Sequence, residues 1–140
     1  MRSIIASTLL AVGVIALDAA LMAAPAVQPP EQQIEITVRN STFLKTRTMP
    51  IRPELPVSIV IRNEDDTNHG FVSPMLTGLA VNGHADGVEF FGRGIDGVHV
   101  GPRKAVVLRM VVPAQGTFTF RCDLHGDMQG EVYLLDVLVA

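Results

Sequence analysis

The chain has 140 residues and a formal net charge of −3, and its charged residues form no long run of one sign. A chain of this length is expected to form one domain with a hydrophobic core, and it is too short for two. The slight acidity excludes the basic surface that nucleic-acid binding requires. Aliphatic residues are plentiful and aromatic residues make up only 5% of the chain, a composition that favours packed strands.

Residues 1–26 have the pattern of a secretory signal peptide. A basic residue, Arg2, precedes an apolar run over residues 4–17, and the segment closes with small residues in the cleavage pattern Ala-x-Ala at 24–26. The apolar run is short for a membrane span, and Asp18 interrupts it where a span would be centred. We therefore expect export to the periplasm or the extracellular space, with an uncleaved N-terminal anchor as the alternative.

The rest of the chain reads as a short linker followed by a β-domain. Residues 27–32 are polar and contain two prolines, and the folded domain is expected over residues 33–140. No window of ten or more residues has a helical period, and proline, glycine and acidic turns separate the extended segments. This pattern predicts an all-β fold, an antiparallel sandwich or a barrel. Alternation with a period of two marks residues 33–39, 57–63, 105–112 and 117–122, and residues 131–139 are extended with a bulge expected at Asp136.

A glycine-rich segment, residues 77–101, interrupts this rhythm. It contains seven of the twelve glycines and two of the four histidines, His84 and His99. We expect an inserted loop between two sheet strands, with a short hairpin of its own. Loops of this length are usually functional or mobile. Nothing in the sequence fixes the direction of the two histidines. We expect both to face solvent, with a secondary metal contact as the alternative.

The single cysteine, Cys122, lies at the end of a predicted strand. The alternation places it on the same side as Phe118 and Phe120, so its side chain should face the core. An odd cysteine in an exported protein indicates an intermolecular disulfide, a reactive thiol or a metal ligand, and a buried inert thiol is the remaining alternative.

Two residues close behind the cysteine favour a metal site. His125 and Met128 add an imidazole and a thioether, and a thiolate with two imidazoles and a weak thioether is the ligand set of blue (type 1) copper. His69 is the best candidate for the second imidazole, because it stands where a new strand begins after an acidic turn. Asp65 and Asp66 in that turn are expected to be solvated.

The segment GTFTFRCDLHGDMQGEV resembles the closing segment of the cupredoxins, the small blue copper proteins, and VSIVIRNEDDTNH is similar to the strand that leads to their first histidine ligand. The resemblance covers about residues 33–139. It implies a Greek-key β-sandwich, here with the Gly-rich inserted loop, that binds one mononuclear copper ion. By the same resemblance the copper ligands are His69, Cys122, His125 and the axial Met128.

Two positions depart from the cupredoxin pattern. Gly70 stands where the family often has the asparagine that helps to hold the cysteine loop, and Asp123 replaces a common serine or threonine after the cysteine. Groups that contact the ligands tune a metal site, so the reduction potential of relatives cannot be transferred to this chain. A carboxylate close to the metal is expected to favour Cu(II) and so to lower the potential.

These observations predict an exported one-electron carrier that cycles between Cu(II) and Cu(I). By resemblance, His125 is the expected exit for the electron, and an apolar rim at Pro74, Met75 and Leu76 is a candidate docking surface for a redox partner protein. The sequence contains no nucleophile elbow, phosphate-binding loop or paired catalytic carboxylates, so we expect no enzymatic activity.

Two other functions remain open. The same ligands would serve a protein that stores, delivers or senses copper in contact with a copper-handling partner, and a reversible electrode response or facile copper loss would separate the two roles. A metal-free β-sandwich used for adhesion or assembly is the third reading, and it predicts no tight copper binding.

Overall fold

The computed structural model describes residues 31–47 and 51–135. The predicted signal peptide, most of the predicted linker and the bulge expected at Asp136 lie outside these residues. One short 3₁₀ helix, η1 (Pro74–Leu76), is the only helical element within them. None of the described residues belongs to a helix long and apolar enough to cross a membrane.

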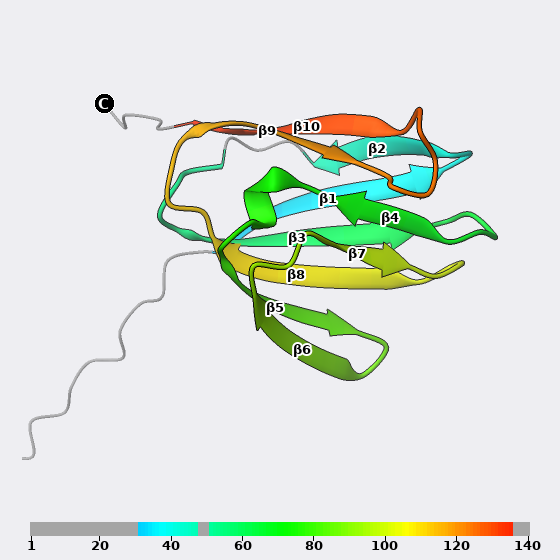
Figure 1. Ribbon diagram of the computed structural model, residues 1–140, viewed down its shortest axis with the longest axis horizontal. Helices are drawn as coiled ribbons and strands as arrows, with labels where there is room; N and C mark the ends of the chain where they lie inside the picture. Colours follow the sequence, from blue (N-terminus) through cyan, green and yellow to red (C-terminus); the bar gives the residue numbers. More distant parts are fainter. Residues whose placement is uncertain (1–30, 48–50, 136–140) are drawn as a thin grey trace, which may run out of the picture.

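The strands form two sheets that pack face to face, so the all-β sandwich is confirmed and a barrel is not formed (Figure 1). The first sheet has the order β2 (Thr42–Arg47), β1 (Gln32–Arg39), β3 (Pro56–Asn63), β8 (Ala105–Val111), β5 (Ala80–Ala85) and β6 (Val88–Arg93). The second has the order β10 (Gln129–Leu134), β9 (Gly116–Arg121), β4 (His69–Val72) and β7 (Gly97–Val100).

The phase of the four strands with clean alternation, over residues 33–39, 57–63, 105–112 and 117–122, is correct. Most of the alternating apolar residues point into the space between the sheets and most of the intervening polar residues face solvent, although Thr37 and Ser58 are buried. Phe71 and Phe120 are buried in this core and pack against each other, with ring centroids 5.1 Å apart and the rings tilted by 33°. The buried residues that the alternation predicted are Ile34, Ile36 and Val38 in β1, Val57, Ile59 and Ile61 in β3, Val106, Leu108 and Met110 in β8, Val112 just beyond it, Phe120 in β9, and Cys122 just beyond that strand.

One pair of strands departs from the antiparallel arrangement that we expected. β1 and β3 are parallel, with Gln32 opposite Val57, whereas the other paired strands are antiparallel. Between β2 and β3 the chain reaches the other sheet, where Ile51 bridges Leu134, and it then enters β3 on the far side of β1. Alternation of apolar residues fixes which face of a strand is buried, but it does not fix the neighbour or the direction.

The Gly-rich segment is more regular than the inserted loop that we expected. The expected hairpin is present as β5 and β6, but it extends the first sheet through β8, and β7 then joins the second sheet beside β4. Gly83 explains part of the composition, because a side chain there would collide with the ring of Phe90 on the neighbouring strand. Glycine at this position therefore serves packing and does not mark a loop.

Candidate metal centre

The buried side chain of Asn63 fixes the turn that presents His69. Its amide donates hydrogen bonds to the carbonyl groups of Thr67, Val100 and Gly101 at 2.7, 3.0 and 2.9 Å. Its oxygen accepts a hydrogen bond from the amide of Asp65 at 3.0 Å. The turn between β3 and β4 is thus tied to the start of the β7–β8 connection, and His69 enters the core as the first residue of β4, only 1% exposed.

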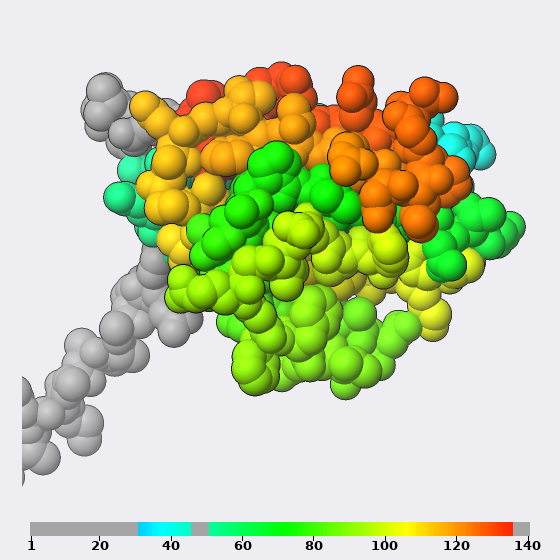
Figure 2. Space-filling model, viewed as in Figure 1, coloured from blue at the N-terminus to red at the C-terminus, as the bar shows by residue number. Residues whose placement is uncertain are grey.

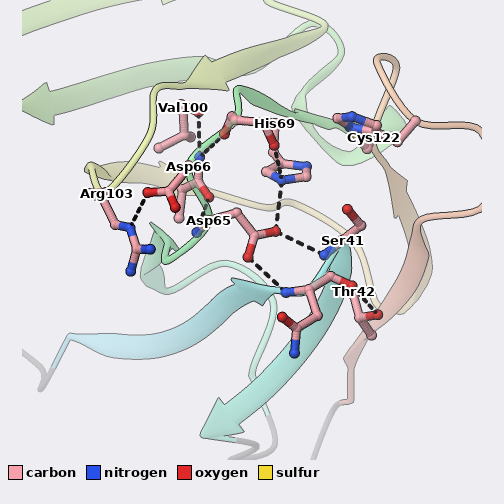
Figure 3. A network of polar contacts seen from close by, with 12 residues as sticks. Ser41, Thr42, Asp65, Asp66, His69, Val100, Arg103 and Cys122 are labelled. Carbon is pink, nitrogen blue, oxygen red and sulfur yellow. Dashed lines mark hydrogen bonds and ion pairs between the residues drawn. The ribbon is translucent and has the colours of Figure 1, made fainter.

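A carboxylate holds the outer edge of the His69 ring. Nε2 of His69 lies 3.0 Å from Oδ2 of Asp65, and the same carboxylate accepts the amide hydrogen bonds of Asn40 at 2.7 Å and Ser41 at 2.9 Å (Figure 3). These amides belong to the turn between β1 and β2, where both residues have positive φ, 50° and 54°. The Ser41 amide, then the Asn40 amide and His69 keep the pKa of Asp65 below its ordinary value, although partial burial acts the other way.

The inner nitrogen of His69 is left without a partner. Nδ1 is buried and makes no hydrogen bond, and an unpaired buried polar atom is costly. An imidazole with its outer nitrogen on a carboxylate and its inner nitrogen free is arranged as metal-ligating histidines usually are. The expectation of a solvated turn was therefore wrong for Asp65, although it describes Asp66, which is exposed and pairs with Arg103.

The cysteine loop, residues 122–128, closes over the ring of His69. Cys122 follows β9 directly and is buried, its amide donates to the Met128 carbonyl at 3.0 Å, and the Met128 amide donates to the His125 carbonyl at 3.3 Å. Two groups approach the sulfur. The amide of Gly70 donates to Sγ at 3.2 Å, and Nδ1 of His125 lies 3.4 Å from it.

The structure brings three of the four predicted ligands into one cluster. The ligand atoms of His69, Cys122 and His125 all lie within 4.8 Å of one another, and this is the single group of its kind among the described residues. The two imidazole rings have centroids 4.6 Å apart. Met128 is buried in a small apolar cluster with Cys122, so it lies beside the group. His84 and His99 are not part of it.

The two departures from the cupredoxin pattern lie against each other. A Cβ atom on Gly70 would collide with Oδ1 of Asp123, so the missing side chain leaves room for that carboxylate. Its other oxygen lies 2.8 Å from Nε2 of His99, which faces Gly70 across β4 and β7. The contact with His99 lowers the pKa of Asp123 despite partial burial. The cysteine loop is thereby tied to β7, a contact that the sequence did not predict.

The candidate docking rim is not a surface. Met75 and Leu76 are buried in the core, and only Pro74 of the three is exposed. The hydroxyl of Ser73 accepts the Met75 amide at 3.2 Å and turns the segment inward as η1. The exposed apolar side chain beside the cluster is Leu124, which precedes the partly exposed His125. The loop that carries both lies at the surface beside β4 (Figure 2).

The donor set fits copper. A thiolate, two imidazoles and a thioether are soft or intermediate donors, and their combination is the one that blue copper sites use. The unpartnered Nδ1 of His69 is the observation that tests this fit, because a bound metal would satisfy it where no protein group does. Carboxylates do not enter the cluster itself, a composition that disfavours magnesium and calcium.

Solved structures that resemble this chain include copper proteins. A multicopper oxidase from Campylobacter jejuni is 17% identical over 79% of this chain and 31% of its own, with a TM-score of 0.50. A copper-containing nitrite reductase from Thermus scotoductus is 14% identical over 75% and 30%, with a TM-score of 0.55. A point mutant of amicyanin in its reduced Cu(I) form is 16% identical over 74% and 82%, with a TM-score of 0.44.

The likenesses to the oxidase and to the reductase establish the fold. The chain has the cupredoxin fold, and the resemblance inferred from the sequence is confirmed at that level. It spans about a third of the length of the oxidase and of the reductase. No protein-family model matches the chain, and no curated protein matches it in sequence.

Proposed function

We propose that the protein is an exported one-electron carrier that binds one copper ion through His69, Cys122 and His125, with Met128 as the axial ligand. The observation that supports this most directly is the cluster of three ligand atoms within 4.8 Å, with an unpartnered buried nitrogen on His69. A copper ion held there would supply the Cu(II)/Cu(I) couple. The solved oxidase and reductase that share this fold are copper proteins, which agrees with a copper site in this chain. The fold does not distinguish a carrier from an oxidase or a reductase.

The surroundings of the cluster favour electron transfer. His69, Cys122 and Met128 are buried, so water has little access to three of the four proposed ligands. Asp65 and Gly70 hold the His69 ring and the Cys122 sulfur through hydrogen bonds of 3.0 and 3.2 Å. Ligands fixed in this way need little movement when the charge at the site changes, and that suits repeated one-electron transfer.

His125 is the proposed exit for the electron. It is less buried than His69, and its neighbour Leu124 is 47% exposed, so a redox partner protein that docks on Leu124 would approach the imidazole edge. Burial of an exposed apolar side chain is a common contribution to such contacts. We propose no catalytic activity, because the chain offers one cysteine and one such cluster among its described residues.

The test is a Cu(II) titration of the protein followed by its visible absorption spectrum. We expect one equivalent of copper and an intense thiolate-to-copper band that is lost in Cys122→Ser and in His69→Gln. His84→Gln, which changes an exposed histidine outside the cluster, is the matched control and should bind as the unchanged protein does. Colourless or weak binding would contradict the proposal.

A second measurement separates a carrier from a protein that stores or delivers copper. A carrier should show a reversible one-electron response at an electrode and should release copper slowly to a competing chelator, as expected from its buried ligands. Rapid loss of copper to the chelator, with a poor electrode response, would instead support delivery.

A further inference from the structure

The outer edge of the first sheet is an unpaired strand with an exposed aromatic side chain. β6 is the last strand in the order of that sheet, and within the described residues no strand pairs with its other side. Phe91, near its middle, is 87% exposed. Figures 1 and 2 show the hairpin at the lower margin of the molecule, away from the loop that follows β9. Unprotected strand edges of this kind are templates for pairing with another strand.

The turn of the hairpin determines which backbone groups face this edge. Asp86 and Gly87 have φ of 46° and 77°, which makes a two-residue type I′ turn closed by the pair Ala85 and Val88. Such a turn is closed by a hydrogen-bonded pair, and hydrogen-bonded pairs then alternate along the strands. Val88 and every second residue after it therefore bond to β5. The N–H and C=O groups of Glu89, Phe91 and Arg93 point to the free edge.

The side chains of the same three residues are self-complementary. Glu89 and Arg93 lie two residues before and after Phe91, they have opposite charges, and both are exposed. Arg93 makes one long contact, 3.5 Å to the carbonyl of Gly78, and neither residue takes part in an ion pair within the described part of the chain. Like charges at both positions would make the strand repel a second copy of itself, whereas the opposite charges of Glu89 and Arg93 do not.

We propose that β6 pairs antiparallel with β6 of a second copy of this chain, about a two-fold axis at Phe91. In this register each Phe91 faces the other, and each Glu89 faces Arg93 of the second copy. Only registers that differ by steps of two residues match the outward backbone groups. Among these, the one centred on Phe91 places both charge pairs opposite each other and covers the aromatic side chains. The proposal does not depend on copper.

Sedimentation velocity of the protein over about 5 to about 500 µM tests this pairing. We expect a reversible dimer whose fraction rises with concentration. Phe91→Ser should raise the dissociation constant by about tenfold or more, because it removes the central aromatic pair. Leu44→Ser, on the opposite edge strand β2, is the matched control and should leave association unchanged. A protein that stays monomeric throughout this range would overturn the proposal. An equal weakening of self-association in Phe91→Ser and Leu44→Ser would also overturn it.

Charge reversal tests the register itself. Glu89→Arg and Arg93→Glu should each weaken self-association, because each brings like charges together. An equimolar mixture of these two variants should associate, and the double variant Glu89→Arg, Arg93→Glu should recover the dimer. If the mixture fails to associate while each variant remains folded by circular dichroism, the proposed register is wrong.

Discussion

The carboxylate of Asp123 lies in the space that a side chain on Gly70 would occupy. The backbone amide of Gly70 at the same time donates to the sulfur of Cys122, and Asp123 reaches past it to His99. One glycine thus serves both the proposed ligand and the contact that ties the cysteine loop to β7. An asparagine at residue 70, as the cupredoxin pattern suggests, would not fit beside this aspartate.

Gly70→Ala should destabilise the metal-free protein by about 1–2 kcal/mol, through overpacking and loss of the exposed hydrogen bond between Asp123 and His99. The new Cβ would displace the Asp123 carboxylate from His99 and press against the Asp123 amide, 3.2 Å away. Urea unfolding measures the change. Gly126→Ala, in the loop that carries Asp123, is the control, since nothing lies within 4 Å of a Cβ there. In an Asp123→Ser background the cost of Gly70→Ala should fall, and an undiminished cost would contradict this packing.

Asp65→Asn should weaken Cu(II) binding by about 10–100-fold, because groups that orient a ligating histidine contribute that much to metal affinity. Competition with a chelator of known affinity measures the effect. Asp66→Asn is the matched control, since Asp66 lies beside Asp65 in sequence but pairs with Arg103 at the surface. An equal loss of Cu(II) affinity in the two variants would assign the effect to general surface charge and not to the contact between Asp65 and His69.

Asp123→Ser should raise the midpoint potential of the copper-loaded protein. The change removes a negative charge next to Cys122, and that charge stabilises Cu(II) relative to Cu(I). Protein-film voltammetry gives the potential, and Asp127→Ser, an exposed position in the same loop, controls for distant charge. An unchanged midpoint potential in Asp123→Ser would show that its carboxylate does not act on the metal.

Tyr133 should ionise above the ordinary pH of a tyrosine. Its hydroxyl donates to the Glu131 carboxylate, and that hydrogen bond, with the adjacent negative charge, raises the pKa of Tyr133 because deprotonation would place two anions together. Tyr133 is the only tyrosine and the chain has no tryptophan, so the ultraviolet absorbance of tyrosinate reports on it alone. Glu131→Gln should lower the pKa and Glu54→Gln should not. A pKa that is insensitive to Glu131 would disprove the contact.

The strands and the cysteine loop could be predicted from the sequence because their signals are local. Alternation with a period of two assigns the buried face of β8 and β9, and the spacing of Cys122, His125 and Met128 lies within seven residues. His69 could be predicted as a candidate ligand because it begins a strand after a recognisable turn. The parallel pairing of β1 with β3 has no such signal, since direction depends on where the intervening chain travels.

The contacts around the cluster could not be predicted for a related reason. The carboxylate of Asp65 is held by two backbone amides of the β1–β2 turn, 24 and 25 residues away in sequence. An aspartate in a polar turn usually faces water, so its sequence neighbours do not indicate this contact. His99 and Asp123 are 24 residues apart and meet only because β7 lies beside β4. The glycines of residues 77–101 gave a misleading signal, because some of them meet packing demands within strands.

The sequence distance across the cluster has a consequence for the order of assembly. Gly70 and Cys122, joined by a hydrogen bond, are 52 residues apart, and β4 meets β9 at a single register pair, Val72 with Arg121. A chain that has not yet docked these strands presents only the Cys122–His125 half of the proposed centre. Tight metal uptake would therefore follow folding and not guide it, so protein synthesised without copper should refold unaided and load to full stoichiometry afterwards.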